Sequence, residues 1–555
     1  MCMSGRFWNH ATSSSFKIAR IAENCPSNLQ DCSSMANLLT KYDLSKTEWE
    51  PLPDGTPGRR RILSGAEIVE DIWNRLFKGY QTLFFAVYLD VSPIPTRDVT
   101  AACREAWKWL RYNIPTIAAP VEVDEKDVSR FVYHAATPEL VEAWADRTCI
   151  VDMQDVVDLD ALRELVCGAK VPSADGDATW LHVAIPKNTE SISKLGFLLH
   201  THHAPFDGTA LKFIFNRYLG QLAKILGSST YVPEALPWGK EVDNLLPAAL
   251  NALASHEPQP IPTSSEETPI ANHPYYESLL KAMEAMGTTF PNPNLWGFRY
   301  READSGWPIC AREEVTLSKT ESDAVMDTLK KLKKDHAFTL THLVHAALAM
   351  VVINDNPPTP DQSSGVIAPQ ALANCRDRLK EPYASRNGYA GYALGVSAIR
   401  IPVKIFMEDD GTLLPMSKDT LIKACSHIRK EYKLQRELPA TLSYMDQGCQ
   451  VLAGGVKAGA LANAIPPDQC YKFSSDGKGE TLLQGVYLDT EGRQLFEISK
   501  WFTALNRVDP APFFRFFSWK GCIILSSDVN KNVISLDDTK GYMQKWKEYI
   551  MLITK

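Results

Sequence analysis

One turn in this chain, where a strand gives way to a helix, restricts its fold more than any other feature. The apolar run at residues 195–199 predicts a strand, and apolar residues at helical spacing begin at Leu211. Between them stands the sequence His202-His203-Ala204-Pro205-Phe206-Asp207-Gly208. Such a turn holds polar side chains at the edge of a sheet, where a histidine near a carboxylate can act as a general base. The turn therefore predicts an enzyme.

The same residues also permit interpretations without catalysis. Asp207 could simply cap the following helix, because its carboxylate can accept hydrogen bonds from the first free backbone amides. His202 and His203 could be ordinary buried histidines. His200 and His202 share one face of the predicted strand and could reach one metal ion, but no carboxylate or cysteine stands nearby at a supporting spacing. We therefore expect no metal site.

Strands and helices alternate along the chain, which predicts an α/β or α+β core. Ser64 and Glu67 have the spacing of a capping box that opens a helix, and a strand is predicted at residues 83–89. The other predicted helices lie at residues 99–110, 211–222, 319–334, 341–353 and 542–553, and the other predicted strands at residues 396–401, 482–488 and 521–525.

The length of 555 residues exceeds one ordinary hydrophobic core, so two domains are expected. Residues 1–60 are polar and predict an N-terminal extension, and the prolines between residues 231 and 275 predict a crossover linker. We therefore expect an N-terminal domain at residues 61–230 and a C-terminal domain at residues 276–555.

The composition is that of a soluble globular protein, with 45% hydrophobic and 23% charged residues. A formal net charge of −7 argues against general binding to nucleic acid. The 12 cysteines include no Cys-x-x-Cys pair, so neither a disulfide framework nor a structural zinc is indicated. Without a secretory signal or a membrane-length apolar run, a cytoplasmic protein is expected.

His342 and His345 lie on one predicted helix, where buried or rim histidines are a better interpretation than metal ligands.

The string His-His-x-x-x-Asp-Gly resembles the active-site motif of the coenzyme A-dependent acyltransferase superfamily. This superfamily includes plant BAHD acyltransferases, chloramphenicol acetyltransferase, condensation domains of nonribosomal peptide synthetases and fungal trichothecene O-acetyltransferases. A second segment agrees, since Asn374-Cys375-Arg376-Asp377-Arg378 is similar to the superfamily's Asn-x-Arg-x-Arg stretch. The resemblance implies that Arg376 pairs with Asp207, with Arg378 as the second choice. Taken alone, the segment would be a solvated basic turn.

A third motif departs from the plant pattern. Where the plant enzymes carry Asp-Phe-Gly-Trp-Gly, this chain has Phe516-Phe517-Ser518-Trp519-Lys520-Gly521. The departure favours the fungal acetyltransferases or the condensation-like enzymes. Further segments resemble the fungal group that includes trichothecene 15-O-acetyltransferase: Leu63-Ser64-Gly65-Ala66-Glu67, Gly79-Tyr80-Gln81-Thr82, Trp109-Leu110-Arg111-Tyr112 and Leu236-Pro237-Trp238-Gly239.

The resemblance implies two chloramphenicol-acetyltransferase-like domains, each a mixed sheet flanked by helices, with the active site in a tunnel between them. His203 would be the general base, and Asp207 would be structural. His202 and Gly208 would support the turn, and Ser518 and Trp519 are candidates for binding the oxyanion or lining the tunnel.

The implied reaction transfers an acyl group from acetyl coenzyme A or another acyl coenzyme A to a hydroxyl of a small hydrophobic natural product. It needs no metal, no permanently bound cofactor and no acyl-enzyme, and a monomer suffices. One alternative is a condensation-like enzyme whose donor is tethered to a carrier protein. Another is a binding or rearrangement protein that has lost acyl transfer.

Overall fold

A computed structural model describes residues 44–259, 294–299, 301, 309–457 and 470–555, apart from residues 78, 80, 188, 229, 386 and 387. Residues 1–43 of the predicted extension, Tyr80 of the family-like segment and residues 260–275 of the predicted linker lie outside the described residues.

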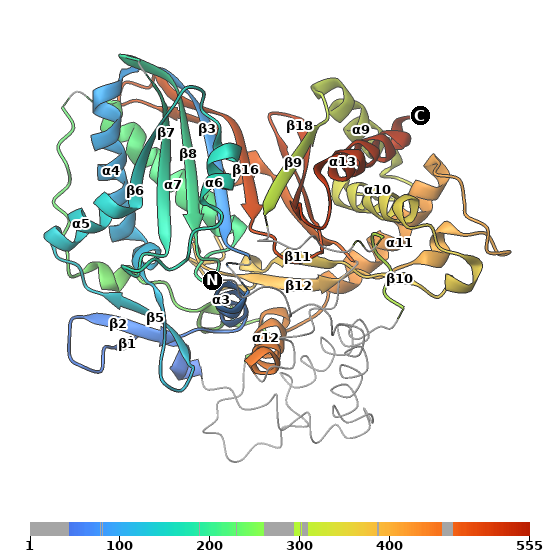
Figure 1. The fold of residues 1–555 in the computed structure, drawn as a ribbon, viewed down its shortest axis with the longest axis horizontal. Helices are drawn as coiled ribbons and strands as arrows, with labels where there is room; N and C mark the ends of the chain where they lie inside the picture. The colour runs from blue at the N-terminus through green and yellow to red at the C-terminus, as the bar shows by residue number, and fades with distance from the viewer. Residues whose placement is uncertain are drawn as a thin grey trace, which may run out of the picture.

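Two mixed sheets dominate the described part of the chain, and they lie side by side in two lobes (Figure 1). The first sheet has the order β15-β16-β3-β8-β7-β6, and the second has the order β12-β11-β14-β17-β18-β9. Both sheets contain parallel and antiparallel pairs. This confirms the predicted mixed α/β class. The strands of the first sheet are β3 (Leu83–Pro95), β6 (Cys149–Gln154), β7 (Thr179–Pro186), β8 (Ser191–Thr201), β15 (Val486–Leu488) and β16 (Gln494–Leu505). Those of the second are β9 (Cys310–Thr316), β11 (Gln370–Asn374), β12 (Leu394–Ala398), β14 (Lys472–Lys478), β17 (Phe513–Trp519) and β18 (Cys522–Asn530).

Two small sheets complete the described strands. One has the order β1-β2-β5-β4 and the other pairs β10 with β13. Their bounds are β1 (Glu50–Pro51), β2 (Gly58–Ile62), β4 (Val121–Val123), β5 (Ser129–His134), β10 (Val366–Ile367) and β13 (Ile401–Pro402). The described α-helices are α3 (Ala66–Leu76), α4 (Thr96–Asn113), α5 (Pro138–Thr148), α6 (Leu159–Val166), α7 (Gly208–Leu226), α9 (Lys319–Leu332), α10 (Leu340–Asp355), α11 (Lys418–Arg436), α12 (Thr441–Lys457) and α13 (Leu536–Met551).

The first sheet takes two strands from the C-terminal part of the chain. β16 pairs with β3 in antiparallel register from Phe496 opposite Val91 to Leu505 opposite Leu83. Residues 276–555, predicted as the C-terminal domain, therefore contribute β15 and β16 to the first sheet. By covering the edge of β3, β16 satisfies backbone groups that an edge strand would leave unpaired.

Hydrophobic periodicity identified the helices that pack on the sheets. α4 buries Val99, Cys103, Ala106 and Leu110, as predicted, and these side chains share one core with α7 and the first sheet. In the second lobe, α10 buries an unbroken run of side chains from residues 342 to 353 against α11 and α13. The interpretation of α10 as a helix enclosed on most sides is therefore confirmed.

Other local predictions need correction. The N-cap of α3 is Gly65 rather than Ser64, and no side chain caps the helix there. One half of the predicted capping box is present, because the Glu67 carboxylate accepts from the Ser64 amide at 2.9 Å. The predicted strand at residues 396–401 divides into β12 and β13, and that at 482–488 becomes a strand only from Val486. Residues 241–254 of the predicted linker pack closely, with Leu250 and Leu253 buried. The free energy gained by burying these apolar side chains explains why the segment packs against the protein despite its prolines.

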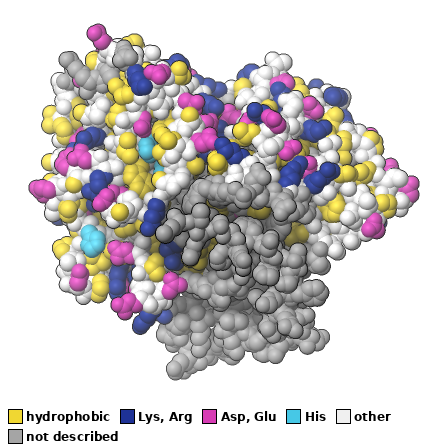
Figure 2. Space-filling view, viewed as in Figure 1, with side chains coloured by type: hydrophobic (Ala, Val, Ile, Leu, Met, Phe, Trp, Pro, Cys, Tyr) yellow, Lys and Arg dark blue, Asp and Glu magenta, His cyan; other side chains and the backbone are white. Residues whose placement is uncertain are grey.

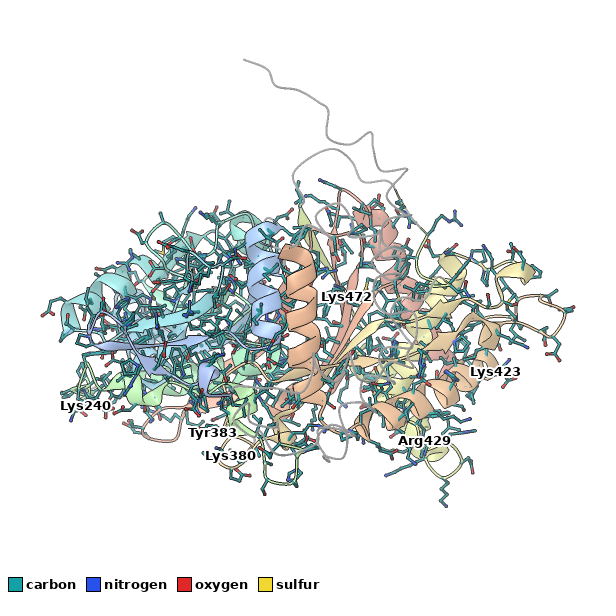
Figure 3. The ribbon with its side chains drawn as sticks, turned by 90° about the horizontal axis from the view of Figure 1, so that it is seen from below. Lys240, Lys380, Tyr383, Lys423, Arg429 and Lys472 are labelled. Atoms are coloured by element: carbon teal, nitrogen blue, oxygen red, sulfur yellow. The ribbon has the colours of Figure 1, made fainter. Side chains whose placement is uncertain are left out.

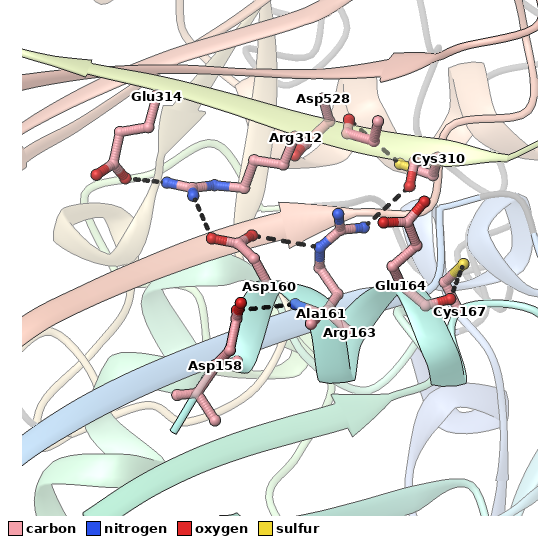
Figure 4. Close-up of polar contacts among 12 residues, drawn as sticks. Asp158, Asp160, Ala161, Arg163, Glu164, Cys167, Cys310, Arg312, Glu314 and Asp528 are labelled. Carbon is pink, nitrogen blue, oxygen red and sulfur yellow. Dashed lines mark hydrogen bonds and ion pairs between the residues drawn. The ribbon is translucent and has the colours of Figure 1, made fainter. Parts of the chain in front are cut away.

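A buried polar cluster joins the lobes where α6 meets β9 (Figure 4). Arg163 of α6 donates to the carbonyl oxygen of Cys310 at 3.3 Å, and Arg312 of β9 donates to Asp160 of α6 at 3.1 Å. Arg312 also contacts Glu314. Both arginine side chains are 2% exposed, so these charges depend on their partners rather than on water.

Over the coloured part of the face in Figure 2, acidic and basic side chains are interspersed with hydrophobic ones.

α3 and α12 lie side by side between the lobes (Figures 1 and 3). Gly65 lets them approach, because a Cβ atom there would lie 2.6 Å from the Cα atom of Asp446 on α12. Asp446 is 2% exposed and accepts a hydrogen bond from Gln450 at 2.9 Å. Burial raises its pKa from 3.8 to about 8.

Asp446→Asn should stabilise the protein increasingly as the pH rises. Between pH values of 3.8 and about 8 the folded state holds the Asp446 proton more tightly than the unfolded chain does. Each pH unit in that window therefore removes up to about 1.4 kcal/mol of stability, which asparagine does not lose. The gap in melting temperature between variant and wild type should widen from pH 5.5 to pH 8. Asp409→Asn, at an exposed position, is the control, and a gap that is equal at both pH values for Asp446→Asn would contradict the expectation.

Candidate active site

The predicted turn lies between the end of β8 at Thr201 and the start of α7 at Gly208. Its first residue is tied to the sheet, since the His202 amide donates to the carbonyl oxygen of Ala178 at 2.9 Å. The structure thus places the motif at the edge of the first sheet, between a strand and a helix, as the sequence predicted.

Asp207 is completely buried and accepts four hydrogen bonds. Oδ1 accepts from the amides of Thr209 and Ala210 at 2.9 and 2.8 Å and from Nη2 of Arg376 at 2.9 Å, and Oδ2 accepts from the amide of Ala393 at 2.8 Å. The carboxylate is thus both the cap of α7 and an anchor for the second lobe. None of these bonds involves His203, so Asp207 is not arranged as the aspartate of a catalytic triad.

Of the two arginines proposed for Asp207, Arg376 makes the contact. It is 4% exposed. Nε donates to the carbonyl oxygen of Tyr389 at 2.9 Å, Nη1 donates to Oδ1 of Asn374 at 3.0 Å, and Nη2 also donates to the carbonyl oxygen of Gly391 at 2.6 Å. Arg378 instead donates to Glu257 at 3.2 Å and to the carbonyl oxygen of Leu438 at 3.0 Å. The interpretation of this segment as a solvated basic turn is therefore wrong for Arg376.

His203 is oriented by its own turn. Its Nδ1 atom lies 2.8 Å from the carbonyl oxygen of Phe206. A carbonyl oxygen only accepts, so Nδ1 carries the proton and Nε2 keeps a free lone pair. The ring is 7% exposed and lies 5.6 Å, centroid to centroid, from the ring of Tyr392. A neutral imidazole held in this tautomer can accept a proton at Nε2.

His202 is arranged in the opposite tautomer. Its Nδ1 atom accepts from the amide of Ala204 at 3.0 Å, so Nε2 carries the proton and lies 3.8 Å from Oδ1 of Asp71. Burial lowers the pKa of His202 to about 4, which keeps it neutral. Asp71 in turn accepts from Ser129 at 2.7 Å and from Arg75 at 2.9 Å. His202 therefore lies against α3, without a hydrogen bond from Nε2 to the residues that the structure describes.

Gly208 begins α7, and a Cβ atom there would meet only the Thr503 side chain at 3.7 Å. That is an ordinary contact distance, so nothing in the structure explains why this position is glycine.

Ser518 and Trp519 lie elsewhere in the fold. Trp519 contacts Trp501, with ring centroids 6.3 Å apart. Trp501 of β16 stands opposite Val87 of β3, and Val87 stands opposite Phe197 of β8, in the middle of the first sheet. Roughly 13 Å of β8 separates Phe197 from the end of the strand that leads to His203. The contacts of Trp519 thus give no support to an oxyanion role beside His203.

α3 and the loop before β12 also contribute to the site, which was not predicted from the sequence. Glu70 and Asp71 of α3 and Tyr392 and Ala393 of the loop all lie against the turn residues or their partners. A signal for α3 was present, because Glu67, Glu70, Asp71 and Asn74 recur at the spacing of one helical face.

The two histidines of α10 have local partners. His342 accepts from the Thr339 amide at 3.1 Å, and His345 contacts the Tyr432 hydroxyl at 3.0 Å. In the described ranges, no group of three or more metal-ligating side chains is arranged to hold an ion. No helix among the described residues is both long and apolar enough to cross a membrane.

Comparisons with known proteins agree with this geometry. A family model described as 15-O-acetyltransferase Tri3 matches residues 60–433. Trichothecene 15-O-acetyltransferase TRI3 of Fusarium sporotrichioides is 22% identical over 526 residues, which cover 90% of this chain and 95% of that protein. Trichothecene O-acetyltransferase TRI3 of Trichoderma arundinaceum is 24% identical over 64% of this chain, and the match spans 65% of that relative, slightly less than two thirds.

Solved structures share the fold. The structure of TRI3 trichothecene 15-O-acetyltransferase from Fusarium sporotrichioides has a TM-score of 0.77 at 17% identity, over 93% of this chain and 99% of that one. The condensation domain of the Monacolin K polyketide synthase MokA has a TM-score of 0.54 at 11% identity, over 89% of this chain and 97% of that one. The similarity to the two enzyme types establishes the architecture.

Arg376→Ala should destabilise the protein far more than Arg378→Ala. Removal of Arg376 leaves the Asp207 carboxylate buried without its counter-charge, which costs about 3 to 5 kcal/mol. Arg378 has a side chain that is 16% exposed, so its loss should cost roughly 1 to 2 kcal/mol. Urea unfolding followed by tryptophan fluorescence measures both. Equal losses for the two variants would contradict the assignment of Arg376 as the essential partner.

Proposed function

Because the chain belongs to the Tri3 15-O-acetyltransferase family, we propose that it transfers an acetyl group from acetyl coenzyme A to a hydroxyl of a small hydrophobic natural product. The observation that carries this proposal is the tautomer of His203, whose Nε2 is free to accept a proton. The names of the relatives favour a trichothecene-like terpenoid alcohol as the acceptor.

The proposed reaction needs one proton acceptor. Nε2 of His203 takes the proton of the acceptor hydroxyl while its oxygen attacks the thioester carbonyl carbon, and the hydrogen bond from Nδ1 to Phe206 supports the imidazolium that forms. When the carbon–sulfur bond breaks, the same proton passes to the sulfur, leaving an ester and free coenzyme A. Asp207 keeps the turn in place through Arg376.

No side chain needs to be acylated. A cysteine nucleophile must be a thiolate. Burial raises the pKa of several described cysteines, for example that of Cys149 to about 12 and that of Cys375 to about 11. The described cysteines are all free, which supports the proposed location in the reducing cytoplasm. Both lobes and the turn come from one chain, so a monomer is proposed, with the tunnel between its lobes.

Coenzyme A and acetyl coenzyme A should each raise the melting temperature saturably. A ligand that binds only the folded state stabilises it by about 2.7 kcal/mol at one hundred times its dissociation constant. Calorimetry should give a single site. Failure of both ligands to bind, with transfer only from a carrier-tethered thioester, would replace this donor by the condensation-like alternative.

His203→Ala should abolish most of the turnover while leaving the protein folded and able to bind the donor. Loss of a positioned general base lowers kcat by about 10²- to 10⁴-fold. Thiol release from acetyl coenzyme A in the presence of an accepted alcohol measures this, and His256→Ala, at an exposed position, is the control. Unchanged turnover in His203→Ala would rule out the mechanism.

A further inference from the structure

α3 turns a row of polar side chains inward. Glu67, Glu70, Asp71 and Asn74 are all buried, with exposed fractions of 7% or less. Such groups are normally retained only with hydrogen-bond partners. All four have at least one: Glu67 pairs with Arg61, Asp71 with Ser129 and Arg75, Asn74 with Thr82, and Glu70 accepts from Tyr392.

Glu70 differs from its three neighbours. Its Oε1 atom lies 3.4 Å from the hydroxyl of Tyr392, but its Oε2 atom is buried and has no partner among the residues that the structure describes. A carboxyl oxygen left unpaired in the interior costs free energy that the other positions of α3 avoid. Such an oxygen is available to the hydrogen-bond donor of a ligand that reaches it.

The position of Glu70 relates it to the reacting centre. Tyr392 packs between α3 and α12 with Ala66 and Cys449, its hydroxyl faces Glu70, and its ring lies 5.6 Å from the ring of His203. One tyrosine thus contacts both the candidate base and the unpaired carboxyl group. An acceptor whose hydroxyl reaches His203 would present its neighbouring atoms to Glu70.

Burial and the neighbouring charges act on the pKa of Glu70 in opposite directions. Burial raises its pKa, whereas His203, Lys472, the Tyr392 hydroxyl and Arg507 act in the opposite direction. A protonated carboxyl group can donate and an ionised one can only accept. A hydroxyl group can do either, so it satisfies Oε2 in both states.

We infer that Glu70 is a specificity-determining residue that hydrogen-bonds a second hydroxyl of the acceptor, close to the hydroxyl that His203 deprotonates. The inference rests on the proposed function and makes its substrate class more specific: the acceptor carries a second hydroxyl close to the reacting one and is not a simple alcohol. A site built around a buried polar group discriminates strongly against an analogue that lacks the matching hydroxyl, because the protein group then stays unpaired.

Borneol and bornane-2,3-diol, which differ by one hydroxyl, are suitable probes. Binding of each to the complex with coenzyme A should be measured by calorimetry for wild type, Glu70→Leu and Glu70→Gln. We expect wild type to bind the diol at least about tenfold more tightly than borneol. Glu70→Leu should lose this preference while keeping its affinity for borneol, and Glu70→Gln, which can still donate and accept, should retain part of it.

Several outcomes would overturn the inference. The first two are equal binding of the two probes by wild type and no binding of either probe. The third is a preference for the diol that survives in Glu70→Leu. The fourth is a loss of coenzyme A affinity in that variant, which would assign Glu70 to donor binding. The melting temperatures of the variants report any unfolding. Because binding is measured without turnover, the inference can fail while His203-dependent thiol release still supports the proposed function, and the reverse outcome is equally visible.

Discussion

The buried carboxylate of Asp207 is the interaction on which the candidate site depends. It caps α7 from within the turn, and it also accepts from Arg376 and from the amide of Ala393, which belong to the second lobe. One side chain therefore fixes the shape of the turn and the position of the opposite lobe. The carbonyl group that orients His203 belongs to Phe206, the residue before Asp207. Asp207 therefore also helps to fix the tautomer of the candidate base.

The lobes are held at a second place by the cluster of Arg163, Arg312 and Asp160. Opening the lobes as a hinge would break these hydrogen bonds and ion pairs. Two such clamps favour a fixed relation between the lobes. Donor and acceptor would then reach His203 through openings that already exist, which agrees with the proposed tunnel between the lobes.

The sequence predicted best what short-range patterns determine. The turn at His203, the cap at Asp207 and the enclosed helix α10 each follow from a few neighbouring residues. The choice between Arg376 and Arg378 depended on a resemblance, because both have the same local character. The pairing of β16 with β3 depends on residues about 400 positions apart, as for Ser92 and Gln494. The acidic face of α3 was overlooked because charged residues on a helix usually face water, and here they meet Arg61, Ser129 and Tyr392 instead.

The place of β16 in the first sheet has a consequence for how the chain is made. β3 and β8 leave the ribosome long before residues 494–505 are synthesised, so the first sheet must wait with one edge of β3 uncovered. An uncovered strand edge can pair with other chains. The N-terminal half is therefore expected to need protection by a chaperone until the last part of the chain is translated, and a fragment that ends before β16 should aggregate rather than fold.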